Sequence, residues 1–256
     1  MSASLAEICA VACADAFRGA SRGESEILAS PIGTIPSIGA RLAKATFAPD
    51  LLLTDGVASV VANVSAVGAI DASRVVEGWL PYRAIFDLVW SGRRHVMMGA
   101  SQIDRHGNQN IAVIGPFERP KAQLLGVRGA PGNTINHRTS YWIPGHSPRT
   151  FVARVDFVSG VGYDRARALG PRASRFHDIH RVVSNKGVFD FETPERAMRL
   201  RSLHPGISLD EVIQSTGFAL VIPEHVEETR SPTSDELRLL REVIDPQSLG
   251  GKELKG

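Results

Sequence analysis

The chain has 256 residues, of which 43% are hydrophobic and 22% are charged, and its formal net charge is +2 at pH 7. This composition is typical of a globular protein, and the near balance of charges argues against extended nucleic-acid binding. No apolar stretch approaches the roughly 20 residues that span a bilayer, and the N-terminal residues lack the pattern of a secretory signal. We therefore expect a cytoplasmic protein that binds neither membrane nor nucleic acid.

The first predicted element is a helix over residues 8–17, introduced by Ser4 and Glu7 at capping-box spacing. The two cysteines of the chain, Cys9 and Cys13, lie four residues apart and therefore share one face of this helix. They lack the spacing and the further ligands of metal or redox sites, so we interpret both as small buried residues. A second helix is expected around residues 38–46.

Short apolar runs bounded by turn residues predict buried strands. Leu51–Leu53 and residues 95–100 are two such runs, and a helix is predicted between them over residues 82–91. This order is that of the strand–helix–strand unit of a parallel sheet. The sequence therefore predicts an α/β fold with an open, mostly parallel but mixed sheet flanked by helices.

The second half of the chain carries further strand and helix patterns. Strands are expected over residues 123–127, 150–157, 180–184 and 187–191, and helices over residues 208–215 and 233–244. Two of these strands alternate in polarity, which is why mixed pairing is expected. Residues 163–176 are interpreted as a loop or irregular connection. Basic residues cluster within residues 165–175 and 196–201 and are interpreted as a solvated helix face or loop, and contact with an anionic cofactor is the alternative. We expect one domain over residues 1–246 and a flexible tail over residues 247–256.

Functional groups of parallel α/β sheets gather beyond the carboxyl ends of strands. Three segments meet that condition, and they are residues 54–56, 99–110 and 126–137. The second is rich in amides, which can hold a thioester carbonyl or an oxyanion, although residues 104–108 can equally be a tight turn. The third is rich in glycine, which permits close approach of a ligand. Its His137 is interpreted as bracing the loop, and a role as catalytic base is the alternative.

Several well-known catalytic motifs do not occur in the sequence. There is no Gly-x-Ser-x-Gly elbow, Walker loop, His-Glu-x-x-His or Gly-x-Gly-x-x-Gly pattern. Serine hydrolases, P-loop enzymes, zincins and dinucleotide oxidoreductases are therefore disfavoured. Asp55, which follows a predicted buried strand, can either react or cap the next helix.

The chain resembles the class I CoA-transferases, and within them the β-chain type of glutaconate CoA-transferase. The resemblance runs from about residue 9 to residue 246. Its most specific stretches are residues 99–110, 128–133, 183–191, 203–206 and 216–218. It implies the open α/β fold of that family, a separate α subunit and an active site where the two subunits meet.

The resemblance also indicates what is missing from the turn at residues 54–56. Chains of this type carry a glutamate here, which attacks the thioester, followed two residues later by a glycine. When that glycine is aligned with Gly56, Thr54 takes the position of the glutamate and Asp55 lies one residue beyond. A threonine without a base partner is a poor nucleophile. In an extended segment the next residue, Asp55, points to the opposite face. The usual covalent route is therefore disfavoured.

This departure is similar to the β chains of the actinobacterial steroid-ring hydrolases, a branch of the same family. The resemblance implies hydrolytic opening of a cyclic β-keto acyl-CoA in cholesterol degradation, with the base supplied by the α subunit in an α2β2 assembly. It implies no cofactor, because coenzyme A is part of the substrate, and no metal. The residues expected to line the substrate pocket are Thr54, Asp55, Gly99, Gln102, Asn108 and Asn133. The alternatives are a CoA-transferase chain with Asp55 as nucleophile, and a non-catalytic scaffold chain.

Overall fold

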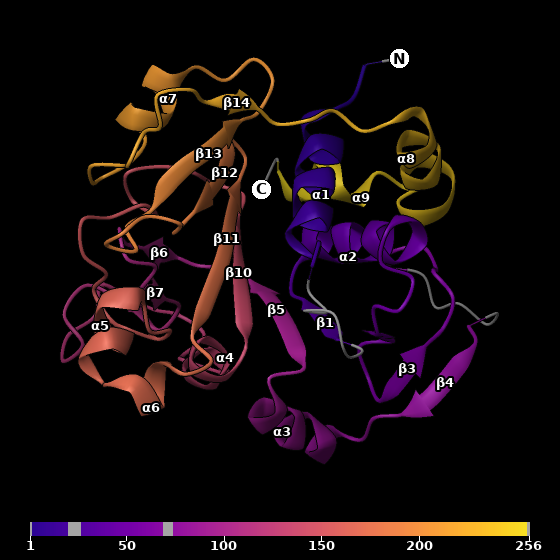
Figure 1. The fold of residues 1–256 in the computed structure, drawn as a ribbon, viewed down its shortest axis with the longest axis horizontal. Coiled ribbons are helices and arrows are strands. Elements are labelled where there is room, and N and C mark those ends of the chain that lie inside the picture. The colour runs from indigo at the N-terminus through magenta and orange to yellow at the C-terminus, as the bar shows by residue number, and fades with distance from the viewer. Residues whose placement is uncertain (1, 20–26, 69–73, 255–256) are drawn as a thin grey trace. The chain divides into compact units, whose positions relative to one another are not determined.

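The computed structural model describes residues 2–19, 27–68 and 74–254 (Figure 1). Its contacts divide the chain into two compact units. Unit 1 comprises residues 1–98 and 230–256, and unit 2 comprises residues 99–229. The single domain expected over residues 1–246 stays a prediction. Within the described ranges, no helix is both long and apolar enough to cross a membrane.

Two packed helices form the centre of unit 1. Helix α1 (Leu5–Ala16) begins at the predicted capping box, in which Ser4 Oγ accepts from Glu7 N and the Glu7 carboxylate accepts from Ser4 N. Helix α2 (Thr34–Thr46) begins four residues before the prediction. The two helices approach closely, because a Cβ added at Gly39 would lie 2.7 Å from Cys13 Cβ. Both cysteines are buried there with reduced thiols, as predicted.

The strands of unit 1 form two groups. Strands β1 (Leu28–Pro31) and β5 (Arg94–Met98) pair in parallel, and the latter was predicted. Strands β2 (Leu53–Thr54), β3 (Ser59–Val61) and β4 (Val76–Trp79) pair in antiparallel order. The prediction of a parallel strand at Leu51–Leu53 is thus largely wrong. Leu52 contributes one parallel bridge to Leu28, and the strand itself turns back through β3.

The remaining helices of unit 1 include two predicted elements and one unpredicted element. Helix α3 spans Tyr82–Ser91 as predicted and ends at Gly92, which has a left-handed φ of 69°. Beyond the second predicted capping box, α8 (Ser234–Arg238) continues into the π-helical turn η1 (Leu239–Ile244). The expected flexible tail instead contains helix α9 (Leu249–Glu253), because Asp245 accepts hydrogen bonds from Leu249 N and Gly250 N and thereby starts it.

A mixed five-stranded arrangement forms the core of unit 2 (Figure 1). Strands β10 (Arg138–Ile143) and β11 (Asp178–Ser184) run parallel, whereas β12 (Gly187–Asp190) pairs antiparallel with both β11 and β13 (Arg199–Leu203). The short β14 (Glu227–Glu228) lies parallel to β13. The strand pairing therefore confirms the mixed α/β sheet that the sequence predicts. Buried rings of Tyr141, Trp142, Phe151, Phe189 and Phe191 fill the space against it.

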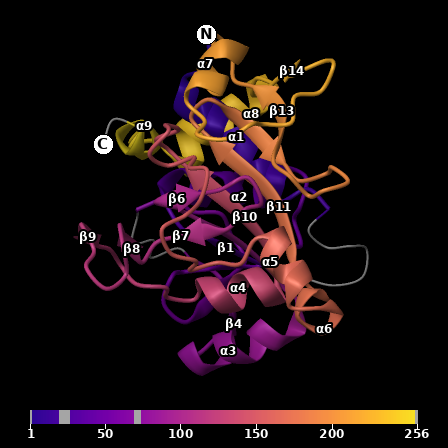
Figure 2. The ribbon, with the colours of Figure 1, turned by 90° about the vertical axis from the view of Figure 1, so that its left-hand side faces the viewer.

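Short elements surround these strands. Two hairpins, β6 (Gln102–Ile103) with β7 (Gln109–Asn110) and β8 (Val113–Ile114) with β9 (Ala122–Gln123), precede β10. The helices of unit 2, drawn from a second side in Figure 2, are α4 (Ala130–Asn136), α5 (Tyr163–Ala168), α6 (Pro171–Ser174) and α7 (Leu209–Gln214).

Several predictions for unit 2 were wrong. Residues 150–157 alternate in polarity but form no strand, because Phe151 finds a single bridging partner, Ile103. Of residues 123–127 only the first lies in a strand, and residues 163–176, interpreted as irregular, contain α5 and α6. Strands β10 and β13 were not predicted.

Candidate active site

The turn after β2 is organised by the carboxylate of Asp55. Its Oδ1 accepts hydrogen bonds from the backbone N–H groups of Val57, Ala58 and Ser59, at 2.9, 2.9 and 3.0 Å. Its Oδ2 lies 2.9 Å from Arg74 Nη1, and the Asp55 side chain is 9% exposed. One carboxylate therefore closes the loop between β2 and β3 and ties it to the segment that enters β4.

These contacts determine the acidity of Asp55. The N–H of Ser59 contributes most to a pKa that lies at about 2, and the Val57 and Ala58 N–H groups and the Arg74 charge lower it further. A carboxylate stabilised in this way as the anion is a weak nucleophile, and most of its lone-pair positions are already occupied. Asp55 therefore acts as a brace, but it caps the turn between β2 and β3 and not a helix, because the chain turns back into β3.

Thr54 occupies the end of β2, where the resemblance places a glutamate. It is partly exposed, and its Oγ1 accepts from Gly56 N at 3.3 Å. Gly56 has φ of 81°, the left-handed conformation that glycine adopts readily. No histidine or carboxylate is hydrogen-bonded to Thr54 Oγ1 among the described residues. The hydroxyl thus lacks the base that would activate it.

In unit 2, the amide-rich segment forms the β6–β7 hairpin. Residues 104–108 are the tight turn considered as an alternative, because Asp104 N donates to Asn108 O and Gly107 has φ of 82°. Asn108 is 1% exposed and its amide is fully used. The Nδ2 donates to Asp104 and to Asp164, each at 2.9 Å, and Oδ1 accepts from Gly162 N at 2.8 Å.

Gln102 is held in a comparable way at the start of the hairpin. Its Nε2 donates to Asp156 Oδ2 at 3.0 Å, and its Oε1 accepts from Asn110 Nδ2 and from Asp156 N. The Gln102 side chain is 6% exposed. Both amides therefore brace the β6–β7 hairpin and its neighbouring loops, so a direct contact with substrate needs a rearrangement of these bonds.

The other two predicted pocket residues lie beside this hairpin and in α4. The carbonyl of Gly99 accepts from Gln109 Nε2 at 2.6 Å, and the nearest atom to a Cβ placed on Gly99 is 3.9 Å away. Asn133 is 6% exposed in α4, where its carbonyl accepts from Thr139 Oγ1. Substrate contact by these residues stays a prediction.

Some polar groups of this region were not identified from the sequence. Arg74 binds Asp55 and Asp164 binds Asn108, in both cases across a long sequence separation. No local sequence pattern predicts either pair. Gln109 Oε1 is buried without a hydrogen-bond partner in the described structure, although it lies in the amide-rich segment. Buried acceptors of this kind are rare enough to require an explanation.

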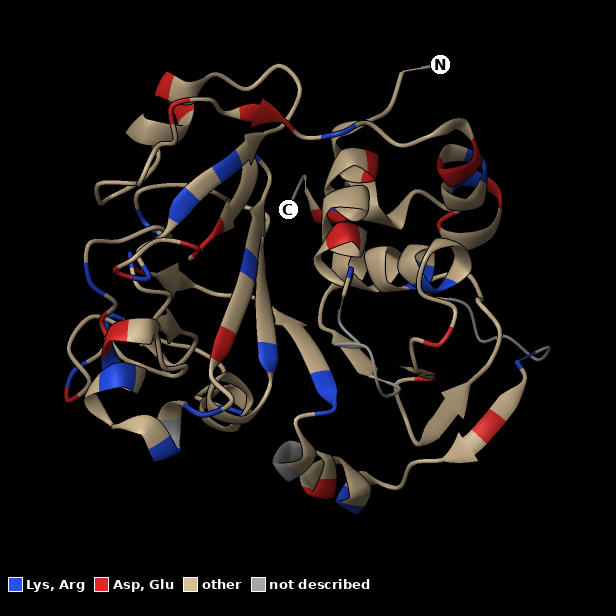
Figure 3. Cartoon of the chain, in the orientation of Figure 1, with Lys and Arg blue, Asp and Glu red and all other residues tan. Residues whose placement is uncertain are grey.

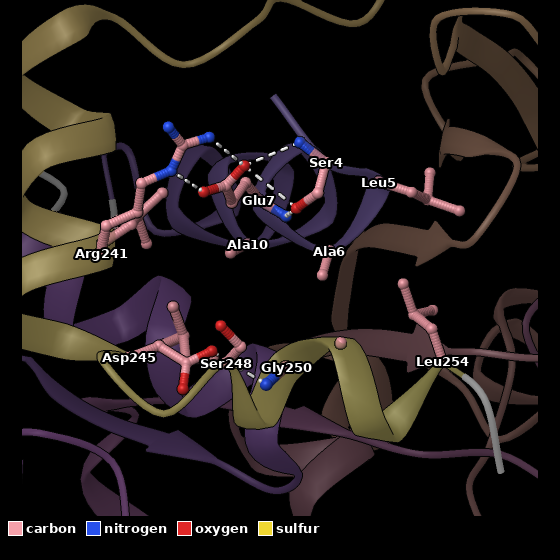
Figure 4. A pocket seen from close by; sticks show the side chains of 13 residues that line it. Ser4, Leu5, Ala6, Glu7, Ala10, Arg241, Asp245, Ser248, Gly250 and Leu254 are labelled. Atoms are coloured by element: carbon pink, nitrogen blue, oxygen red, sulfur yellow. Dashed lines mark hydrogen bonds and ion pairs between the residues drawn. The ribbon is translucent and has the colours of Figure 1, made fainter. Parts of the chain in front are cut away.

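Unit 1 also contains a cavity of about 460 Å³ among α1, η1 and α9 (Figure 4). Apolar side chains such as Leu240 and Leu254 line it, together with the ion pair between Arg241 Nε and Glu7 Oε1 at 2.6 Å. None of the six predicted pocket residues borders this cavity. No trio of His, Cys, Asp or Glu side chains in the described ranges is arranged to hold a metal ion.

Comparison with known proteins identifies the family. Residues 32–215 match the family model described as Coenzyme A transferase. The chain belongs to the coenzyme A transferase family. Its fold agrees with glutaconate coenzyme A-transferase from Acidaminococcus fermentans at a TM-score of 0.80, with 24% identity over 95% of each chain.

Two further similarities within the coenzyme A transferase family are much stronger. The chain is 56% identical to the "Cholesterol ring-cleaving hydrolase IpdB subunit" of Rhodococcus jostii, over 97% of this chain and 95% of that protein. The crystal structure of Rhodococcus jostii RHA1 IpdAB contains a chain with a TM-score of 0.92 and 54% identity, and each chain is 99% covered. The predicted fold class and the predicted resemblance are thereby confirmed.

Proposed function

We propose that this chain is the β subunit of an enzyme that hydrolytically opens a ring of a cholesterol-derived β-keto acyl-CoA. The observation that carries the proposal is the 56% identity, over nearly the whole length, to a protein named as a cholesterol ring-cleaving hydrolase subunit. The partner is an α subunit of the same family, in an α2β2 complex located in the cytoplasm. The reaction uses no metal and no cofactor apart from the coenzyme A of the substrate.

The proposed reaction needs water and a base rather than a carboxylate nucleophile on this chain. A base on the α subunit removes a proton from water, and the hydroxide adds to the ring ketone. Collapse of the tetrahedral adduct breaks the bond between the ketone carbon and the carbon next to the thioester. The electron pair moves onto that carbon as the thioester enolate, which then takes up a proton. The products are one carboxylate and an intact thioester on the opened ring.

The geometry of the Asp55 turn supports this division of roles. Thr54 replaces the attacking glutamate of the transferases, and Asp55 is held by three backbone N–H groups and Arg74. A covalent acyl intermediate on this chain is therefore disfavoured. The residues of this chain proposed to contact the substrate are Thr54, Asp55, Gly99, Gln102, Asn108 and Asn133.

The test is to co-express the chain with its α subunit and to incubate the complex with a cyclic β-keto acyl-CoA in 18O-labelled water. We expect mass spectrometry to detect one added water, one 18O atom in the new carboxylate and coenzyme A still attached. Transfer of coenzyme A to an added carboxylic acid would overturn the proposal. So would hydroxylamine trapping of an acyl group on Asp55 during turnover.

Thr54→Ala is a second test of the same proposal. Because the base is placed on the α subunit, loss of the Thr54 hydroxyl should reduce turnover much less than loss of that base. If Thr54→Ala abolishes turnover as completely, the attacking group lies on this chain and the proposed mechanism is incorrect.

A further inference from the structure

A second cavity lies in unit 2, where α5 and α6 approach the segment before β13. Its volume is about 360 Å³, within the range of small-molecule sites. The side chains and backbone that line it include Tyr163, Arg167, Gly170, Ser174, His177 and Arg196. Figure 3 shows the Lys and Arg positions on α5 and α6 in blue. We call this cavity the α5–α6 pocket.

Both arginines of the pocket lack an anionic partner. Neither the Arg167 nor the Arg196 guanidinium forms an ion pair or a hydrogen bond within the described ranges, whereas the neighbouring Arg138 and Arg105 are paired with carboxylates. The Arg196 side chain contacts the Tyr163 ring, whose centroid is 5.4 Å from the guanidinium carbon.

No carboxylate among the described residues lines the α5–α6 pocket, although three lie near it in sequence. Asp164 accepts from Asn108, Asp178 from Arg138, and Glu195 from Arg105. These acids are therefore hydrogen-bonded to groups outside the pocket, and none of them forms an ion pair with Arg167 or Arg196.

The backbone of Arg196, an exposed residue of the pocket, has an energetically costly conformation. Its φ is 54°, a left-handed conformation that glycine favours and that arginine rarely adopts. Thr193 fixes this turn, because its carbonyl accepts from Arg196 N and its Oγ1 accepts from Ala197 N at 2.8 Å. Strain of this kind often occurs where a side chain has a function.

The remaining walls are neutral and already hydrogen-bonded. His177 Nε2 donates to Val161 O at 2.8 Å, and burial lowers the pKa of its imidazole, so the ring is uncharged near pH 7. Tyr163 OH donates to Ile179 O, and burial raises its pKa to about 12. The charged groups that remain available to a ligand are thus the two guanidinium groups, which bind phosphate through paired N–H donors.

We propose that the α5–α6 pocket binds phosphate groups through Arg167 and Arg196. The phosphate groups are those of the nucleotide end of coenzyme A. This choice of ligand rests on the proposed function. A free inorganic phosphate or pyrophosphate has the same chemistry and is the other source. The anionic-ligand alternative considered for the arginine-rich segment is the one that the pocket favours.

The experiment uses the co-expressed complex and isothermal titration calorimetry at low ionic strength, with coenzyme A and pyrophosphate as separate probes. The variants are Arg167→Gln and Arg196→Gly, and Arg154→Ala is the control. Arg154 is an exposed arginine of unit 2 that does not line the pocket. Glycine at residue 196 removes the charge and suits the left-handed backbone, so the melting temperature should stay the same or rise.

We expect Arg167→Gln and Arg196→Gly each to raise the Kd of coenzyme A about tenfold or more, with Arg154→Ala unchanged. If pyrophosphate binding weakens and coenzyme A binding does not, the pocket takes a free phosphate species. If neither probe is weakened by either variant, the proposal is overturned. Coenzyme A without an acyl group suffices for these titrations, so their result does not depend on whether the ring-opening reaction occurs.

Discussion

Replacing Asp55 by asparagine or by alanine separates the two roles that its carboxylate can have. Asparagine keeps an Oδ1 that can accept from Val57, Ala58 and Ser59 N–H groups, and it loses the charge paired with Arg74. Alanine removes every one of these acceptors. A structural brace should therefore tolerate asparagine and not alanine, whereas a nucleophile should tolerate neither.

The contacts give the size of the expected effects. Each backbone hydrogen bond contributes roughly 1 kcal/mol, so Asp55→Ala should cost about 2–3 kcal/mol, or roughly 5–10 °C in melting temperature. Arg74 is 49% exposed, so losing its ion pair through Asp55→Asn should cost less than about 1 kcal/mol. The stabilisation by Asp55 should be fully present above about pH 4 and lost as the pH falls toward about 2, because folding lowers its pKa.

The assay is calorimetric melting of the complex together with turnover of the cyclic β-keto acyl-CoA. We expect Asp55→Asn to retain most of the turnover and nearly the wild-type melting temperature. The reasoning is refuted if Asp55→Asn melts like the wild type and has no turnover, because the carboxylate would then be required for chemistry rather than for the turn.

Three further predictions concern packing, the hairpin amides and pH. Gly39→Ala should cost about 1–3 kcal/mol in melting experiments, because the added Cβ would lie 2.7 Å from Cys13 Cβ. Asn108→Ala should cost roughly 2–4 kcal/mol, since it removes the amide that donates to Asp104 and Asp164 and leaves the buried Gly162 N–H without its acceptor. Burial lowers the pKa of His146 to about 3, so wild-type stability should fall with pH below about 6.5, and His146→Gln should weaken that dependence.

Each of these three predictions has a control variant or an outcome that would contradict it. Gly251→Ala adds a Cβ with no atom within 4 Å, and in helix α9 it should leave the melting temperature unchanged or slightly raised. If Asn108→Ala raises KM without changing the melting temperature, Asn108 is a substrate contact and not a brace. If the wild type and His146→Gln lose the same stability between pH 7 and pH 5, His146 does not contribute to acid unfolding.

Local patterns were sufficient for some parts of the fold. The capping boxes of α1 and α8 depend on residues three apart, and the structure has both. Strand β10 was missed because it is buried through Thr139 and Ser140 rather than through a continuous apolar run. The alternating residues 150–157 are the opposite case, since a strand needs a partner that no local pattern supplies.

The prediction of the candidate site from the sequence was limited in the same way. Position in the chain identified the turn at Thr54 and Asp55 and the tight turn at residues 104–108. The bracing of Asp55 depends on Arg74, 19 residues away, and that of Asn108 on Asp164, 56 residues away. Sequence periodicity carries no information on such pairs. The three-dimensional contacts were therefore needed to show that these side chains brace loops.

Helix α2 has no side-chain cap of its own, and Ile35 N donates instead to Glu253 Oε2 at 2.7 Å. Unit 1 is therefore completed by residues that follow unit 2 in the chain, so they are synthesised after the whole of unit 2. Unit 2 can make all its internal contacts first, whereas α2 must wait for a carboxylate 218 residues downstream. A nascent chain arrested before residue 253 would contain every strand described above and still lack this contact.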